Sequence, residues 1–418
     1  MKKEEKGNRL FFISIVVVLF SLTCLLIVGK VTWKLEKSEE KQINWEEQYP
    51  FKVENLMEGE STSAVSNENK AVVEKYCIIM DKFENIGESW SPKIWKKAGY
   101  VMNAVFSDPG IGGSNIRLKN GYWTMLQSRS KDSDIEQQTD NIAYLKQYVE
   151  KQNIPFLYIQ PPVKICKQDD ELPAGMEDDT NENIDLVLNG LKKNGVNYLD
   201  LRENVHQDFD NHYSLFYKTD HHWNVHAGLW ATDIIEQQIK NEFGISLDTE
   251  FNSTDLYKEK IYKNAMFGSS GHAVTHFIEK SEDFSILVPN FDTDYRIIVP
   301  DKEIDKSGTF EEVLINYDEL EKEIQAGGGW AYETLVYGNR PLAKIINKKN
   351  IDGAKILMIR DSFSLAVAPY LVMGCSELDL IDTRQTNGNF NGSVRTYIEE
   401  NKPDIVLMLL SSPGNTYK

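Results

Sequence analysis

The chain has 418 residues, of which 41% are hydrophobic and 11% aromatic, which is enough to bury one large core or two ordinary ones. Its formal net charge of −18 argues against binding nucleic acid, or an anionic membrane surface, through bulk electrostatics. Its four cysteines show no CxxC or Cys/His zinc spacing, so we expect Cys77, Cys166 and Cys375 to be buried as small apolar residues.

A long apolar segment near the N-terminus predicts a membrane anchor. The segment LFFISIVVVLFSLTCLLIV has 19 residues without a charge and is roughly 28 Å long as a helix, close to the thickness of the hydrocarbon core. It exceeds the apolar run of a signal peptide, and no cleavage site of small residues follows it. Basic residues flank it equally, so its orientation rests on the short tail before it and the long domain after it. We expect a cytoplasmic tail (1–9), a single transmembrane anchor (10–31) and a domain outside the cell membrane.

After the anchor, the composition predicts a stalk followed by an α/β domain. Residues 32–70 are rich in Glu, Lys, Ser and Asn, as solvated linkers are, so the domain is assigned to residues 71–418. In its first part, helical spacing over residues 141–152 and 183–195 alternates with the short apolar strands IPFLYIQPP and VNYLDLR.

The pattern is less regular over residues 250–350, which we interpret as an insertion or cap. Strands are predicted at FSILVPN, YRIIVP and VLINY, and the glycine-rich loop AGGGWAYETLVYGNR follows them. The aromatic residues Trp330, Tyr332 and Tyr337 of this loop would suit sugar stacking, but a core or interface cluster is the favoured interpretation.

Helices and strands alternate strictly elsewhere. A helix is predicted over residues 224–243 with Asn224 as its N-cap. Near the C-terminus, strand KILMI precedes a helix over residues 364–372, and strand ELDLID, helix SVRTYIEENK and strand DIVLMLL follow. This alternation predicts a parallel sheet with helices on both faces.

Polar clusters follow these strands, at the edge where parallel sheets place their ligands. In chain order they are QPPVK, YKTDHHW, RDSFS, DTRQTNGN and SSPGN. Ser362 of RDSFS lies between a strand and a helix, where backbone N–H groups point toward an oxyanion; simple N-capping is the alternative.

Asp220 and His222 of YKTDHHW favour catalysis by Ser362. A serine hydroxyl needs a base, and an imidazole needs a carboxylate to fix its tautomer; an Asp-x-His turn supplies both. We expect His221 to point the opposite way and to contact structure or solvent.

The same histidines also allow a zinc site. His222 and His226 are four residues apart, with His221 or Asp220 as a third ligand. However, the chain has no HExxH glutamate here, and a helix that starts at Asn224 would break the shared face. We therefore expect no metal and no cofactor, and we expect His226 to be a buried or capping histidine.

The sequence TDHHW followed by NVHAG resembles the DHHW family, which is similar to the alginate O-acetyltransferases with an SGNH hydrolase-like domain. In that group an Asp-x-His-Trp element comes early and a serine element comes late, which reverses the order in SGNH esterases, and RDSFS matches the late element. The resemblance covers roughly residues 95–415. It implies an SGNH hydrolase-like α/β fold with circularly permuted motifs, Ser362 as nucleophile, His222 as general base and acid, and Asp220 as its orienting carboxylate.

The oxyanion-hole residues of the esterases have no clear match. By strand position, the loop DTRQTNGN and Asn415 of SSPGN occupy their places. Arg384 of this loop would stabilise the oxyanion or bind a sugar hydroxyl, or would instead pair with Asp382. Arg360 stands where the esterases have glycine, so the loop is less open or the arginine points away. Trp223 is expected to form a wall of the site.

The resemblance implies a membrane-anchored extracytoplasmic O-acetyltransferase that modifies a cell-envelope or secreted polysaccharide through an acetyl-serine intermediate. Because acetyl-CoA is absent outside the cell, a membrane-bound O-acyltransferase partner would supply the acetyl group. Two alternatives remain open: a polysaccharide deacetylase or esterase with the same triad, and a non-catalytic polysaccharide-binding assembly protein.

Overall fold

The computed structural model describes residues 115–167, 169–173, 176–274, 279–385 and 394–411. The predicted tail, anchor and stalk lie outside these ranges. Within them, no helix combines the length and apolar character needed to cross a membrane. Cys166 and Cys375 are buried and unpaired with each other, as expected, while Cys77 lies outside the described residues.

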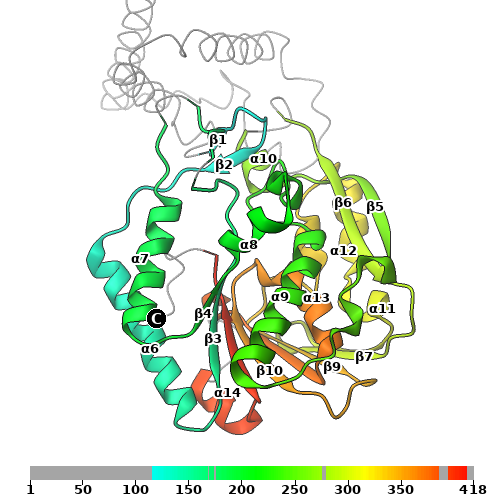
Figure 1. Ribbon diagram of the computed structural model, residues 1–418. Helices are drawn as coiled ribbons and strands as arrows, with labels where there is room; N and C mark the ends of the chain where they lie inside the picture. The colour runs from blue at the N-terminus through cyan, green and yellow to red at the C-terminus, as the bar shows by residue number, and fades with distance from the viewer. Residues whose placement is uncertain (1–114, 168, 174–175, 275–278, 386–393, 412–418) are drawn as a thin grey trace, which may run out of the picture.

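An eight-stranded sheet forms the centre of the molecule, in the order β4-β3-β12-β10-β11-β9-β7-β8 (Figure 1). The first five strands of this order run parallel to one another, as the strand-helix alternation predicted. They are β3 (Phe156–Gln160), β4 (Tyr198–Asp200), β10 (Lys355–Arg360), β11 (Glu377–Ile381) and β12 (Ile405–Leu409).

The sheet is mixed, so the prediction of a parallel sheet holds only for these five strands. Strand β9 pairs with β11 and β7, and β7 pairs with β8, each in antiparallel register. Their bounds are β7 (Tyr295–Val299), β8 (Ile304–Gly308) and β9 (Leu342–Asn347). Because a short connection joins β7 to β8, the chain reverses there instead of crossing over through a helix. Part of the segment interpreted as an insertion or cap therefore belongs to the main sheet.

The rest of that segment includes a separate antiparallel ribbon of β5 (Tyr257–Met266) and β6 (Glu282–Pro289). The strand predicted at VLINY is wrong. This stretch spans the end of helix α11 (Phe310–Leu314) and the start of α12 (Tyr317–Gln325).

Two helix caps explain the error at VLINY. The Glu312 side chain accepts a hydrogen bond from the Thr309 N–H (2.9 Å), and the Asn316 side chain accepts one from the Glu319 N–H (3.3 Å). These capping interactions outweigh the β-propensity of the apolar residues between them.

Helices cover both faces of the sheet, as predicted (Figure 1). One face packs against α6 (Asp132–Glu150), α7 (Thr180–Lys193) and α14 (Val394–Asn401), and the other against α9 (Val225–Phe243) and α13 (Ser364–Leu371). The side chains of β10 alternate accordingly: Ile356 and Met358 belong to the core below α9 and α13, and Leu357 and Ile359 to the core below α6.

Helix α9 begins as predicted and packs unusually close to α13. The Asn224 side chain accepts hydrogen bonds from the N–H groups of His226 (3.1 Å) and Ala227 (3.2 Å). A Cβ added at Gly228 would lie 1.9 Å from the Ala366 carbonyl oxygen. The helix that follows DHHW therefore contacts the helix that follows Ser362.

The remaining elements are short, and β1 and β2 form a separate ribbon beside α10 (Figure 1). They are β1 (Asn115–Arg117), β2 (Trp123–Met125), α8 (Leu201–Asp208), α10 (Ser269–Val274) and the 3₁₀ turns η1 (His212–Leu215), η2 (Thr249–Phe251), η3 (Thr254–Leu256), η4 (Pro300–Lys302), η5 (Ala331–Thr334), η6 (Val372–Gly374) and η7 (Thr383–Gln385).

Candidate active site

A tight turn after the central strand β10 presents Ser362; we call residues 361–363 the serine turn. Asp361 is fully buried and fixes this turn from both sides. Its Oδ1 accepts a hydrogen bond from the Phe363 N–H (3.0 Å), and its Oδ2 accepts two from the N–H and hydroxyl of Ser411 (2.7 Å each). The carboxyl end of β12 thereby holds the serine at the carboxyl end of β10.

Asp220, His221 and His222 of the DHHW motif lie on a second loop, residues 217–222, which we call the histidine loop. An antiparallel bridge between Phe216 and Trp223 closes its base. The loop bends throughout instead of being extended, so His221 and His222 lie side by side with ring centroids 3.9 Å apart. The expectation that His221 points the opposite way is therefore wrong, although it does contact structure, through the Ser269 hydroxyl (2.9 Å).

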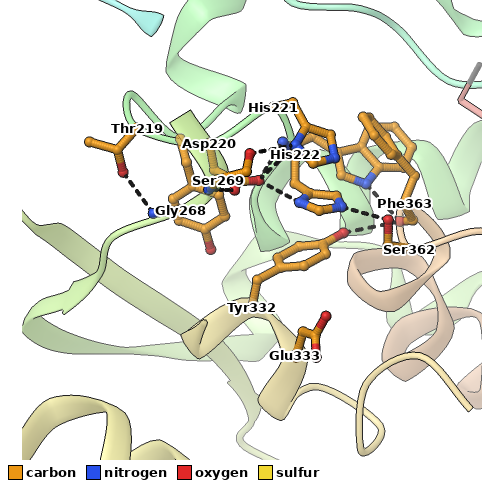
Figure 2. Close-up of polar contacts among 12 residues, drawn as sticks. Thr219, Asp220, His221, His222, Gly268, Ser269, Tyr332, Glu333, Ser362 and Phe363 are labelled. Atoms are coloured by element: carbon orange, nitrogen blue, oxygen red, sulfur yellow. Dashed lines mark hydrogen bonds and ion pairs between the residues drawn. The ribbon is translucent and has the colours of Figure 1, made fainter. Parts of the chain in front are cut away.

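The two loops bring Asp220, His222 and Ser362 into one hydrogen-bonded chain (Figure 2). His222 Nε2 lies 2.6 Å from Ser362 Oγ, and His222 Nδ1 is hydrogen-bonded to Asp220 Oδ1. The serine and histidine are each 9% exposed and the aspartate is fully buried. This is the arrangement in which an imidazole removes the serine proton while a carboxylate fixes its tautomer.

Asp220 is held as a carboxylate. Burial alone would raise its pKa, but His222, His221 and the hydrogen bonds to the carboxylate hold the pKa of Asp220 well below its usual range. One of these hydrogen bonds comes from the Ser269 N–H to Oδ2 (2.6 Å). A Cβ on the preceding residue, Gly268, would lie 2.1 Å from the same oxygen, so this close approach requires glycine.

Trp223 and Tyr332 support the serine turn from behind. The Trp223 indole N–H donates to the Phe363 carbonyl (2.8 Å), and the Tyr332 hydroxyl donates to the same oxygen (3.2 Å). The Tyr332 ring also stacks on His222, with centroids 4.3 Å apart. Because Trp223 is fully buried, it does not form the expected wall of the site. Tyr332 belongs to the hydrophobic core, in agreement with the core cluster that the sequence favoured for this aromatic loop. Trp330 of the same loop is 44% exposed.

Lys164, in the QPPVK cluster, was not predicted as a functional residue. Its buried ammonium group donates to the backbone carbonyls of Trp123 (2.7 Å), Tyr217 (2.7 Å) and Asp220. Burial lowers the pKa of Lys164 to about 8, against the opposing effects of Asp220 and Glu282. The QPPVK motif placed this lysine at a strand end, but no periodicity indicates that its ammonium is buried.

The Glu282 carboxylate binds the same loop through N–H groups. It accepts hydrogen bonds from the N–H groups of Lys218 (2.7 Å) and Thr219 (2.6 Å) and from the Thr219 hydroxyl (2.5 Å). The Lys164 ammonium binds carbonyl groups of the histidine loop, and the Glu282 carboxylate binds N–H groups of the same loop. Together these two charged groups hold the loop in one conformation.

A cavity of about 330 Å³ opens in front of Ser362. Its lining includes Thr124, Gln127, His221, Arg384 and Ser411. The cavity is large enough for a small ligand, and its lining combines these polar side chains with apolar ones such as Val163 and Phe363.

Arg384 lines this cavity and also forms the predicted pair with Asp382. Its Nε and Nη2 donate to the two oxygens of Asp382 (2.9 and 2.7 Å). Arg360 points away from the cavity and donates to Asn339 Oδ1 and the Gly338 carbonyl (2.9 Å each). Burial lowers the pKa of Arg360 to about 10. Asn415 lies outside the described residues.

Three clusters in the described part of the chain bring possible metal ligands within 4.8 Å of one another. They are Asp220, His221 and His222; Cys166, His206 and His212; and Asp169, Asp170 and Glu171. In the first, both nitrogens of His222 already bind Asp220 and Ser362, and in the second, His212 Nε2 already binds the Lys164 carbonyl (2.9 Å).

His226, expected to be buried or capping, is half-exposed and pairs with Glu259 (2.9 Å).

A family model matches part of this chain. The family model described as the SGNH hydrolase-like domain of the acetyltransferase AlgX matches residues 122–263, which include the histidine loop. The resemblance expected from the sequence is confirmed. No curated protein matches the chain significantly in sequence.

Solved structures of two other proteins are similar to this chain in fold. PatB1 of Bacillus cereus is 21% identical, with a TM-score of 0.60 over 73% of this chain and 98% of that chain. A DHHW family protein from Eubacterium siraeum is 14% identical, with a TM-score of 0.53 over 74% of this chain and 96% of that chain. At these identities the likeness shows a common fold. A second structure of the Bacillus protein carries a sulfonyl adduct (TM-score 0.58, 20% identity, 73% of this chain and 98% of that chain).

Proposed function

We propose that this protein is an O-acetyltransferase that modifies a cell-envelope or secreted polysaccharide through an acetyl-serine intermediate. The observation that carries the proposal is the hydrogen-bonded chain from Asp220 through His222 to Ser362, which opens onto a cavity of about 330 Å³. The AlgX-type match supports the acetyl group, because the description of that family names an acetyltransferase. The polysaccharide acceptor is proposed from the resemblance of the DHHW and RDSFS motifs to the alginate O-acetyltransferases.

In the first half-reaction, Ser362 Oγ attacks the acetyl carbonyl of the donor while His222 Nε2 takes the serine proton. The positive charge that forms on the imidazole is stabilised by Asp220. The donor's leaving oxygen then takes the proton back from His222, and Ser362 carries the acetyl ester.

The backbone N–H of Ser362 is the first candidate to stabilise the oxyanion. It has no hydrogen-bond partner among the residues that the structure describes, and it belongs to the nucleophile itself. Arg384 is the second candidate, because it lines the same cavity while Asp382 fixes its orientation.

In the second half-reaction, a sugar hydroxyl attacks the acetyl-serine carbonyl and gives its proton to His222. The ester bond to Ser362 Oγ then breaks, Oγ takes this proton from His222, and the acetylated sugar leaves. Attack by water instead would make the protein an esterase with the same triad. A non-catalytic binding protein has less support, since such a protein has no need for a serine, a histidine and a carboxylate in hydrogen-bond contact.

The proposal also includes the location of the protein in the cell and the partner that supplies the acetyl group. The apolar segment at residues 10–28 would anchor the chain, with the catalytic domain outside the cell membrane. A membrane-bound O-acyltransferase would then deliver the acetyl group. Protease treatment of intact cells tests this placement, since a domain that stays protected would contradict it.

Replacement of the nucleophile tests the proposal. The full-length protein should release 4-nitrophenol from 4-nitrophenyl acetate, and Ser362→Ala should reduce the rate by at least about 10³-fold, because the variant lacks the hydroxyl that forms the acetyl ester. Mass spectrometry after donor treatment should find one acetyl group on the peptide that contains Ser362. Ser376→Ala is the matched control, because Ser376 is a buried serine beside β11, bonded to the Ala354 carbonyl (3.1 Å). Equal activity of Ser362→Ala and Ser376→Ala would refute the triad.

A further inference from the structure

His221 is the one residue of the DHHW motif whose position the proposed triad and its support leave unexplained. Asp220 and His222 belong to the triad, and Trp223 is buried behind the serine turn. The His221 side chain is 35% exposed and lines the same cavity as Ser362. Its ring lies directly beside that of His222 (Figure 2).

The hydrogen bonds of His221 leave one ring nitrogen available. Nδ1 is bound to the Ser269 hydroxyl (2.9 Å) and lies 3.6 Å from Asp220 Oδ1. Nε2 has no hydrogen-bond partner among the residues that the structure describes. A negative carboxylate next to Nδ1 favours a proton on Nδ1, which leaves the Nε2 lone pair as a hydrogen-bond acceptor.

The His221 ring is neutral, so its Nε2 lone pair remains available as a hydrogen-bond acceptor. Burial and the neighbouring His222 lower the pKa of His221 to about 3, against the opposing effect of Asp220. A neutral imidazole in a partly buried cavity accepts a hydrogen bond from a hydroxyl group, as His222 does from Ser362.

We propose that His221 binds a second hydroxyl group of the acceptor, adjacent to the one that is acetylated, so that the site selects sugars with neighbouring free hydroxyls. The reacting hydroxyl gives its proton to His222 Nε2 as its oxygen attacks the acetyl-serine carbonyl. The hydroxyl on the next carbon donates to His221 Nε2 and transfers nothing. The two imidazoles lie side by side, as two hydroxyls do on adjacent carbons of a pyranose ring.

This inference rests on the proposed acyl transfer and adds selectivity to it. Water and simple alcohols have one hydroxyl and would use only the His222 contact, whereas a sugar would use both contacts. A single hydrogen bond to a neutral group corresponds to about a tenfold advantage.

Competition between small acceptors tests the role of His221. The full-length protein is given 4-nitrophenyl acetate with ethanol, or with methyl glucoside, methyl galactoside or methyl mannoside at equal concentration. Ethyl acetate, acetylated glycoside and free acetate are then quantified. At least one glycoside should capture the acetyl group about tenfold better than ethanol relative to water.

Variants separate hydrogen bonding from packing. His221→Phe keeps an aromatic ring without an acceptor and should remove the preference for the glycoside over ethanol. His221→Gln keeps an acceptor and should retain much of that preference. His226→Phe is the matched control, since His226 is a half-exposed histidine paired with Glu259, and its preference should equal that of the wild type.

The other outcomes would contradict either the proposed role of His221 or the proposed acyl transfer. If no glycoside is preferred by the wild type, or if His221→Phe keeps the preference, His221 does not bind the acceptor. If the wild type is no more active than Ser362→Ala, the proposed acyl transfer itself fails, and the inference falls with it.

Discussion

Lys164 joins three separate segments at the candidate site. Its ammonium group donates to the carbonyl of Trp123 in β2 and to the carbonyls of Tyr217 and Asp220 in the histidine loop, and Lys164 itself lies on the loop after β3. An ammonium has three N–H donors, and three carbonyls satisfy them completely. The position of Asp220 therefore depends on a residue more than fifty positions earlier in the chain.

Removal of this ammonium should disturb the triad more than its distance from Ser362 suggests. Lys164→Met keeps the length of the side chain but leaves three buried carbonyls without a donor, so we expect a loss of about 3 kcal/mol or more in unfolding free energy. We also expect a fall of about 100-fold or more in kcat for 4-nitrophenyl acetate, because the histidine loop loses its fixed conformation.

The spectroscopic readout is the far-downfield NMR resonance of the His222 Nδ1 proton, which should disappear or shift in the folded Lys164→Met variant. Lys218→Met is the control, because Lys218 also lies on the histidine loop but its ammonium group is more exposed than that of Lys164 and pairs with Glu279. An unchanged resonance and kcat in Lys164→Met would mean that the ammonium only stabilises the fold.

At the scale of elements, the spacing between two helices sets the distance between histidine and serine. Helix α9 begins three residues after His222, and α13 begins two residues after Ser362. Their close contact at Gly228 and Ala366 therefore controls the hydrogen bond between His222 Nε2 and Ser362 Oγ.

Gly228→Ala should push these helices apart. The new Cβ meets a backbone carbonyl, which cannot turn aside, so overpacking should cost about 1–3 kcal/mol, partly offset by the better helix propensity of alanine. Activity per folded molecule should fall by about tenfold or more, as measured by kcat together with denaturant unfolding.

Gly190→Ala provides the matched control on the opposite face. Its Cβ would lie 2.6 Å from the Thr139 side chain, where α6 meets α7. We expect a comparable loss of stability with kcat unchanged. If both glycine variants keep wild-type kcat, the contact between α9 and α13 does not set the triad geometry.

The elements that carry the candidate site were the ones that the sequence could predict. Residues 224–243 have helical periodicity because the helix buries one continuous face, and the strand KILMI is a short apolar run that is buried on both faces. VLINY was misread since two capping interactions, each local and polar, outweighed its apolar composition. The pairing of β9 with β11 is antiparallel through contacts distant in sequence, which periodicity does not encode.

The roles of site residues were predictable only where chemistry restricts the residue type. Asp220, His222 and Ser362 could be proposed because a triad needs these three groups. Lys164 and His221 could not, because a lysine or histidine in a polar cluster is compatible with many environments. Their roles follow from neighbours that the fold supplies.

At the scale of the whole molecule, two hydrophobic cores on either side of one sheet hold residues 140 positions apart in contact. The larger core contains a buried acid that plays no part in the site. Glu236, on α9, is 1% exposed, and Asn252 donates a hydrogen bond to its Oε2 (2.6 Å). Burial raises the pKa of Glu236 to about 8, and Asp233 and Asp248 add to this effect.

This acid should make the stability of the whole fold depend on pH. The folded protein keeps the Glu236 proton up to about pH 8, whereas the unfolded chain releases it near the ordinary value of 4.5. Between these values the folded state binds more protons, so stability should fall as pH rises. The contribution of Glu236 is fully present below pH 4.5 and is lost as pH approaches 8.

Glu236→Gln removes the titrating group and should flatten this dependence. Guanidinium unfolding at pH 5 and pH 8 should show that the variant gains about 3 kcal/mol relative to the wild type between the two conditions. Glu242→Gln, an exposed position on the same helix, should follow the wild type at both pH values. Parallel pH dependences for wild type and Glu236→Gln would mean that Glu236 is already ionised in the folded protein, with its charge stabilised by Asn252 and by water that reaches the carboxylate.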